Sequence, residues 1–104
     1  MSKASKILCP VERAAKIVGN RWTALIMRDL LLNSSRRYQD LQTSLAGIPP
    51  NTLSSRLQML EENGIVERRL YQTHPPRAEY VLTEKGRALG PVIVAMRDWG
   101  RKHA

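Results

Sequence analysis

Residues 47–70 constrain the fold more than any other segment. Their sequence predicts a turn, then a helix that ends at a glycine, then a strand. Pro50 suits a first helical position, because its fixed φ is already helical and its missing N–H is not needed there. The pair Asn63-Gly64 is a typical helix end. Between them, three leucines recur at the spacing of one helical face: Leu53, Leu57 and Leu60. The sequence therefore predicts a helix over 50–63 with one buried side.

The opposite side of this helix carries short hydrogen-bonding side chains and one arginine near its N-terminal end. That composition is typical of a helix that reads base edges in a DNA major groove. An ordinary solvated helix face is the alternative, and for the arginine it would mean a salt bridge to Glu62 or Asp40. The flanking segments favour the DNA-reading interpretation. The candidates for base contact are Asn51, Thr52, Ser55 and Arg56.

The chain has 104 residues, enough for one domain with a modest core, and helix formers dominate. Its net charge is +8 and its sequence pI about 10.4, and a small, strongly basic domain usually meets a polyanion. Residues 1–37 hold most of the excess, with eight Lys or Arg and two acidic residues. We expect residues 1–8 to form a flexible basic arm, and residues 9–104 to form a mainly α domain with a small β-hairpin.

Three helices are expected before the one already described. The first covers residues 10–18, and the second, over 21–32, is apolar nearly all round and should be the buried central helix. A short third helix over 38–45, with Tyr38 in its core stripe, ends at a glycine-containing turn. With the helix over 50–63 it forms a helix-turn-helix over residues 38–63.

Two extended runs rich in Val, Ile, Leu and Tyr follow, over 65–71 and 78–82. They predict a β-hairpin over 65–82, the wing of a winged helix-turn-helix. The joining residues 72–77 include two prolines, so we expect them to be a loop that cannot continue the ladder.

A last helix is expected over residues 83–102, capped by Thr83 and bent at Gly90-Pro91. Its apolar stripe is wider than one small hairpin can cover, so part of it should contact another subunit. Trp99 is the expected anchor of that contact, because aromatic residues dominate interface energetics. The alternative is that the stripe packs on the chain's own second helix. A membrane-surface helix is disfavoured, because the polar face is only weakly basic.

Eight short motifs, in this order and spacing, carry a resemblance to a known family. They are Cys-Pro-Val-Glu-Arg, Arg-Trp-Thr, Arg-Arg-Tyr, Gly-Ile-Pro-Pro, Leu-Ser-Ser-Arg-Leu, Glu-Asn-Gly-Ile-Val-Glu-Arg, Pro-Pro-Arg-Ala-Glu-Tyr and Leu-Thr-Glu-Lys-Gly. Over roughly residues 8–100 the chain resembles the HxlR-type winged helix-turn-helix transcription regulators. The resemblance implies a homodimer that binds a near-palindromic operator in double-stranded DNA, and a repressor is the expectation from the family alone.

The family's dimer contact usually involves the first and last helices, here the predicted dimerisation helices over 10–18 and 83–102. Together with the apolar stripes, this predicts a set of interface residues. They are Val11, Ala14, Leu89, Ile93, Met96 and Trp99.

Further DNA contacts are expected outside the recognition helix. Arg36 and Arg37 precede the third helix, where a helix-turn-helix crosses the phosphate backbone, and a solvated charge pair is the equally open alternative. In the wing, Arg77 suits a narrow minor groove, whereas His74 is expected to be a plain exposed loop residue.

Cys9 is the only cysteine, which excludes an internal disulfide and any CxxC motif. It lies just before a helix start with Lys6 and Arg13 nearby, surroundings that favour a reactive thiolate. Some members of the family sense oxidants or electrophiles through a matching cysteine. Such sensing would need Cys9 of both subunits, a small thiol, or direct alkylation. The alternative is a structural Cys9 buried at the dimer contact, with regulation by a small ligand bound between subunits.

Other classes of protein fit less well. His74 and His103 with one cysteine do not make a metal site, and no cofactor is expected. A single-thiol enzyme would need a His or acid at a recognisable spacing from Cys9, so we expect no enzymatic activity. A basic RNA-binding domain is a weaker rival, because few aromatic side chains lie near the hairpin. No signal peptide or membrane span is evident, so a cytoplasmic location is expected.

Overall fold

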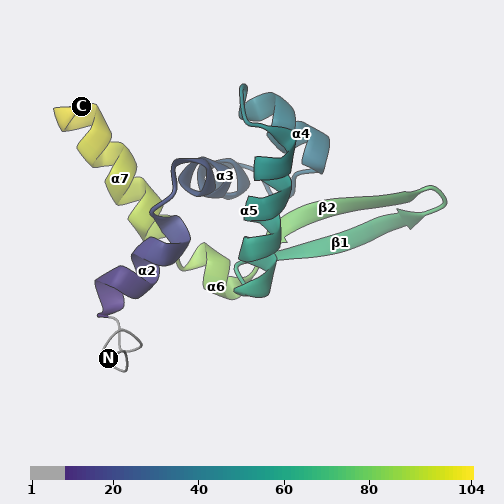
Figure 1. Ribbon diagram of the computed structural model, residues 1–104, viewed down its shortest axis with the longest axis horizontal. Helices are drawn as coiled ribbons and strands as arrows, with labels where there is room; N and C mark the ends of the chain where they lie inside the picture. Colours follow the sequence, from purple (N-terminus) through teal and green to yellow (C-terminus); the bar gives the residue numbers. More distant parts are fainter. Residues whose placement is uncertain (1–8) are drawn as a thin grey trace.

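The structure, a computed structural model, describes residues 9–104, and the predicted basic arm over 1–8 lies outside the described residues (Figure 1). Six helices and one two-stranded antiparallel sheet make up the described part, in the arrangement of a winged helix-turn-helix. The mainly α fold with a small hairpin is therefore confirmed. In chain order the elements are α2 (Pro10–Val18), α3 (Arg21–Leu32), α4 (Tyr38–Ser44), α5 (Pro50–Glu62), β1 (Val66–Thr73), β2 (Pro76–Leu82), α6 (Glu84–Arg87) and α7 (Gly90–His103).

Helix α3 is the centre of the core, as predicted, and it contacts α2, α4, α5, α7 and β2. The Asn20 side chain caps its start by accepting hydrogen bonds from the N–H groups of Trp22 and Thr23. Its burial is less complete than the sequence pattern predicts, because Leu32 at its C-terminal end is 75% exposed. The core residues with the lowest exposure are Ile26, Met27, Leu41, Leu53, Leu57 and Leu60.

Helix α5 begins at Pro50 and packs through the three leucines that the sequence singles out. It ends before Gly64, whose φ of +71° lies in the left-handed region that favours glycine. The motif Leu-Thr-Glu-Lys-Gly forms hydrogen bonds to this turn. The Thr83 hydroxyl donates to the carbonyl oxygen of Gly64, and the Lys85 ammonium donates to that of Asn63 at 2.8 Å. The C-terminal end of α5 is thereby fastened to the start of α6.

The hairpin is longer than expected, and the predicted loop over 72–77 is wrong. The ladder runs from Val66 opposite Leu82 out to Thr73 opposite Pro76, with one irregularity between Leu70 and Gln72. Pro76 is the first residue of β2, where a missing N–H is tolerated. Both strands project far beyond the helices, so most of β1 is exposed (Figure 1).

Arg36 forms an isolated β-bridge to the edge of the two-stranded sheet, a contact that the sequence pattern does not reveal. It pairs with Tyr80 on the free edge of β2 through two backbone hydrogen bonds of 3.0 and 2.7 Å. This pairing joins the α3–α4 connection to the base of the wing.

The predicted single helix over 83–102 is divided into α6 and α7. Pro91 explains the division, because it has no N–H and its ring would collide with the carbonyl four residues earlier, at Arg87. Helix α7 therefore starts afresh at Gly90 and leaves the body at its own angle (Figure 1). Within residues 9–104, no helix combines the length and apolarity that crossing a membrane requires.

Candidate nucleic-acid interface

The four candidate base-reading residues do not share one face of α5. Asn51 and Ser55 are exposed on the side opposite the buried leucines, whereas Thr52 and Arg56 are partly buried on its flank. Among residues 9–104, Arg56 takes part in no ion pair. Its two expected acidic partners are engaged elsewhere, since Glu62 accepts from Gln58 and Asp40 from Arg37. The guanidinium of Arg56 is thus available to a ligand.

Tyr38 fixes the N-terminal end of α5 against α4. Its ring is partly buried against the core, as expected, but its hydroxyl also donates to the carbonyl oxygen of Pro50 at 2.8 Å. The same hydroxyl lies 3.2 Å from Oγ of Ser54. The polar end of α5 is therefore held in a defined position. Sequence periodicity places the ring of Tyr38 but cannot reveal where its hydroxyl finds a partner.

Arg36 is tied to a buried carboxylate on α3. Asp29 is only 4% exposed, and it accepts hydrogen bonds from Nε of Arg36 at 3.0 Å and from Oγ of Ser44 at 3.0 Å. A buried carboxylate needs such partners, because an unpaired charge in the core is costly. Arg36 thus has a role in joining α3 to α4 and β2. A contact between Arg36 and phosphate stays a prediction. It would be made by the guanidinium N–H groups that do not bind Asp29.

Arg37 lies where the helix-turn-helix meets the wing. Its backbone N–H donates to the Asp40 carboxylate at 3.0 Å, and that bond, followed by the Arg37 side chain, lowers the pKa of Asp40. The Tyr71 phenol on β1, followed by Asp40, raises the pKa of the Arg37 guanidinium. Half of the Arg37 side chain stays exposed. It is the better placed of the two arginines for a phosphate contact.

The wing carries further exposed cationic side chains. Arg77 stands opposite Gln72 near the tip and is exposed, and so is His74 at the turn. Closer to the body, Arg69 pairs with Glu67 at 3.3 Å, an exposed contact that contributes little. The structure therefore presents predicted DNA contacts from three elements: the start of α4, the N-terminal half of α5, and the wing.

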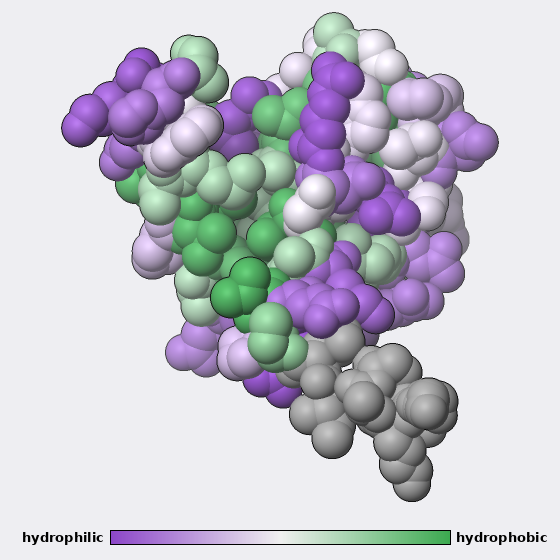
Figure 2. All heavy atoms as spheres, turned by 60° about the vertical axis from the view of Figure 1, so that its left-hand side comes forward, coloured by the Kyte–Doolittle hydropathy of each residue, from purple (hydrophilic) through white to green (hydrophobic). Residues whose placement is uncertain are grey.

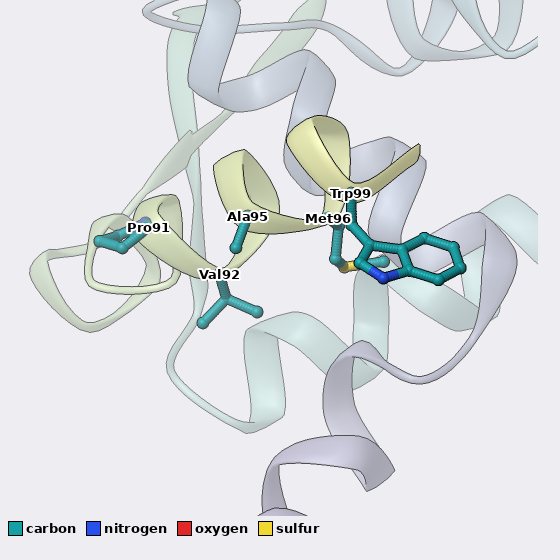
Figure 3. A pocket seen from close by; sticks show the side chains of 5 residues that line it. All are labelled: Pro91, Val92, Ala95, Met96 and Trp99. Carbon is teal, nitrogen blue, oxygen red and sulfur yellow. The ribbon is translucent and has the colours of Figure 1, made fainter. Parts of the chain in front are cut away.

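A second surface, which we call the α2–α7 face, is apolar and lies away from these elements. Figure 2 shows apolar residues gathered on this side of the molecule, and Val11 and Trp99 are 77% and 63% exposed. Five side chains from one side of α7 line a shallow depression of about 620 Å³ there (Figure 3). They are Pro91, Val92, Ala95, Met96 and Trp99.

The six predicted interface residues are not all on this face. Val11, Ala14, Met96 and Trp99 are exposed, but Ile93 is buried in the core and Leu89 is partly buried against it. Both of these residues pack on their own chain, the alternative that the sequence leaves open. Val92 and Ala95, which are not among the predicted interface residues, are exposed instead. The register of α7 relative to α3 determines which of these four residues are buried and which are exposed. An apolar stripe alone does not show that register.

Cys9 is exposed and occupies the position just before α2. Its Sγ accepts a hydrogen bond from the N–H of Glu12 at 3.3 Å, so the thiol itself caps the helix. In a single chain the sulfur is therefore reachable from solvent. Across residues 9–104, His, Cys, Asp and Glu form no cluster of three that could hold a metal ion.

Comparison with known proteins gives one consistent result. Residues 17–104 match the HxlR-like helix-turn-helix family. An uncharacterized HTH-type transcriptional regulator of Bacillus subtilis, YdeP, is 37% identical over 95 residues, which are 91% of this chain and 73% of that protein. The redox regulator HypR in its oxidized form superposes with a TM-score of 0.85 at 32% identity, covering 92% of this chain and 98% of that one. The reduced form of the B. subtilis transcriptional regulator YodB superposes with a TM-score of 0.79 at 34% identity, covering 94% and 96%.

Proposed function

We propose that this chain, which belongs to the HxlR-like helix-turn-helix family and is a transcriptional regulator, represses transcription as a homodimer on a near-palindromic operator. The observation that carries the proposal is the exposed polar side of α5, held in place by Tyr38. A helix presented in this way, with short side chains at its N-terminal end, can enter a major groove. Asn51 and Ser55 would contact base edges, and Arg56 would reach a base or a phosphate from the flank.

The phosphate contacts would come from the elements on either side of α5. Arg37 at the start of α4 and Arg77 in the wing are both exposed and cationic. Such contacts set the position and register of a protein on the duplex, while base contacts set the sequence. The chain's net charge of +8 supports this assignment.

Dimerisation would bury the α2–α7 face. A contiguous apolar surface of this kind on a small domain usually marks a contact with another protein, and identical chains pair most often about a two-fold axis. Trp99 would be its anchor. Two α5 helices related in this way would enter successive major grooves about one helical turn apart.

Cys9 would regulate the dimer as a sensor of oxidants or electrophiles. Its exposure and its place at a helix start support this role, as does the likeness to HypR, which is described as a redox regulator. Joining Cys9 of both subunits would form one S–S bond and release two protons and two electrons to the oxidant. Alkylation of a single thiolate would need no partner cysteine. Either change next to α2 would alter the dimer contact and so the spacing of the two α5 helices.

A binding titration on duplex DNA from the protein's own upstream region tests the proposal. We would measure affinity with reduced protein and after a thiol oxidant, using Cys9→Ser as the matched control. Tight binding that resists competitor DNA and changes with oxidant only in the wild type would support both the regulator and the sensor. Tight binding indifferent to oxidant would contradict the sensor alone. Equal affinity for unrelated duplexes or structured RNA would contradict the operator proposal.

A further inference from the structure

A groove between α3 and the C-terminal half of α7 is distinct from the elements predicted to contact DNA, and it shares Met96 alone with the depression on the α2–α7 face. Its volume is about 480 Å³, within the range of small-molecule sites. Helix α7 packs closely on α3 at its start, where Ile93 is buried, and then diverges (Figure 1). The groove lies between the two helices, and Leu25, Leu32 and Val94 are part of its apolar wall.

Three arginines rim this apolar groove, and none of its lining residues is acidic. Arg97 already donates to the carboxylate of Asp98 at 3.0 and 3.1 Å. Arg28 on α3 and Arg101 on α7 have no ion pair among residues 9–104, and both are exposed. Two cations without acidic partners, one from each helix, therefore line the same apolar groove.

The groove would stay open in the proposed dimer. Successive residues of a helix are rotated by about 100°, so Arg97 and Trp99, two positions apart, lie on nearly opposite sides of α7. Arg101 lies on the side of Arg97, one turn further along. Met96, between the two sides, is the single residue that lines both the groove and the α2–α7 depression. A partner seated on Trp99 would thus leave the arginine side of α7 accessible.

We propose that this groove binds an amphipathic organic anion, a carboxylate carried on an aliphatic or aromatic body. The apolar body would lie against Leu25, Leu32 and Val94, and the carboxylate would be held by Arg28 and Arg101. Arginine suits this role because its planar fork matches a carboxylate and is weakly hydrated. A cation of the same shape would be repelled, and a short carboxylate would lack the apolar contact.

The groove is also placed to influence the DNA-reading half. Arg28 is followed on α3 by Asp29, whose carboxylate binds Arg36 and Ser44. Helix α7, the other wall, carries the apolar face proposed for dimerisation. An anion that bridges α3 and α7 would set the angle between these two parts, and so the operator affinity. This consequence rests on the proposed function, whereas binding of the anion does not.

Calorimetric titration of the full chain tests the binding directly. The probes are decanoate, decyltrimethylammonium and acetate, all below micelle-forming concentrations. We expect saturable binding of decanoate, and binding at least about tenfold weaker for the other two. A charge-assisted hydrogen bond corresponds to roughly a tenfold change in affinity. Equal binding of the cation, or no binding of decanoate, would overturn the proposal.

Variants locate the site. Arg28→Gln/Arg101→Gln should weaken decanoate binding about a hundredfold, at roughly tenfold for each arginine. Lys102→Gln is the matched control, because it removes a neighbouring charge outside the groove lining and should leave the affinity unchanged. All three positions are exposed, and thermal unfolding would verify that the variants keep the fold. Equal loss in the control would mean a non-specific charge effect and would overturn the site.

Two further readouts separate the remaining outcomes. If a second copy of the chain occupies the groove, Arg28→Gln/Arg101→Gln would change the dimer dissociation constant in sedimentation, and decanoate would not bind. That result overturns the anion site. Operator titration with and without decanoate tests the regulatory consequence. A chain that binds decanoate but no operator would retain the groove proposal and refute the proposed function.

Discussion

Two halves of the molecule, which we call the DNA-reading half and the dimer half after their proposed roles, differ in how far they bury their apolar side chains. In the first, comprising α3 to α5 and the base of the hairpin, Leu53 and Leu60 are fully buried. In the second, the α2–α7 face, Val11 is 77% exposed and Trp99 63% exposed. The first half is complete within one chain, whereas the second presents an apolar surface without a partner among residues 9–104.

Polar contacts follow the same division. The first half holds a buried carboxylate, Asp29, with two hydrogen-bonding partners, and a tyrosine hydroxyl that joins two helices. On the second, Trp99 stacks at a tilt on His103 of its own helix, at 5.2 Å between ring centres. The DNA-reading half is therefore held together by contacts within one chain, whereas the spacing of two such halves in the proposed dimer would be set at the α2–α7 face.

The largest expected effect is on the core of the reading half. Leu60→Ala should reduce the free energy of unfolding by about 2–5 kcal/mol, because it removes a fully buried side chain and leaves a cavity. Leu32→Ala is the matched control, since the same substitution at a 75% exposed position should cost less than about 0.5 kcal/mol. Urea unfolding measures both. Similar losses would remove the distinction between buried and exposed leucines on which the comparison depends.

In the dimer half, by contrast, a substitution should weaken assembly and leave the fold of the single chain intact. Trp99→Ala should weaken dimerisation by about 2–3 kcal/mol, the size of an interface hot spot. Helical content measured by circular dichroism should stay near that of the wild type, because Trp99 contributes little to the core. Sedimentation equilibrium gives the dissociation constant, with Lys102→Ala on the same helix as control. An unchanged constant would mean that the α2–α7 face is not the dimer contact.

Two glycines sharpen the contrast in packing. A Cβ on Gly86 would lie 2.1 Å from the carbonyl oxygen of Ile65, so Gly86→Ala should cost about 1–3 kcal/mol of stability by overpacking. A Cβ on Gly100 of α7 would meet nothing within 4 Å. Gly100→Ala should therefore stabilise the helix by up to about 1 kcal/mol. Thermal unfolding of the two variants measures whether each substitution lowers or raises stability. Destabilisation by both would contradict the open surroundings of Gly100 on α7.

Substitutions at the DNA surface should separate base reading from phosphate binding. Ser55→Ala should reduce the preference for operator over unrelated duplex, by about 1–2 kcal/mol for a lost base contact. Arg77→Gln should weaken binding to both duplexes alike and lower the slope against log salt concentration by about one. Fluorescence anisotropy at several salt concentrations measures these quantities. If Arg77→Gln alters specificity while Ser55→Ala does not, the assigned roles of α5 and the wing are reversed.

The smallest effect concerns the start of α4. The backbone N–H and side chain of Arg37 lower the pKa of Asp40 in the folded state. The ionised carboxylate therefore stabilises the fold above its unfolded pKa, and this contribution is lost as the pH falls through the lowered folded value. Asp40→Asn should flatten the acid limb of the stability curve and leave the affinity for DNA nearly unchanged. Parallel acid limbs in wild type and variant would contradict the assignment.

Much of the fold follows from local signals in the sequence. Pro50 and Asn63-Gly64 mark the ends of α5, and its leucines identify its buried side, because these effects depend on residues a few positions apart. The single bridge at Arg36, the buried position of Asp29 and the length of the ladder to Pro76 were not predictable, because each depends on pairing between distant segments. The same reason explains Ile93: a stripe on α7 shows which residues are apolar, but only its angle to α3 decides which of them face a partner.

Hydroxyl-radical footprinting on an operator selected from the upstream region tests the central claim most directly. We expect two protected segments with centres about one helical turn (~10 bp) apart, one for each α5 of a dimer. Trp99→Ala, at concentrations where it is monomeric, should protect a half-site only weakly. One protected segment for the wild type at saturation, or two segments retained by the monomeric variant, would contradict the claim that the α2–α7 face sets the spacing of two recognition helices.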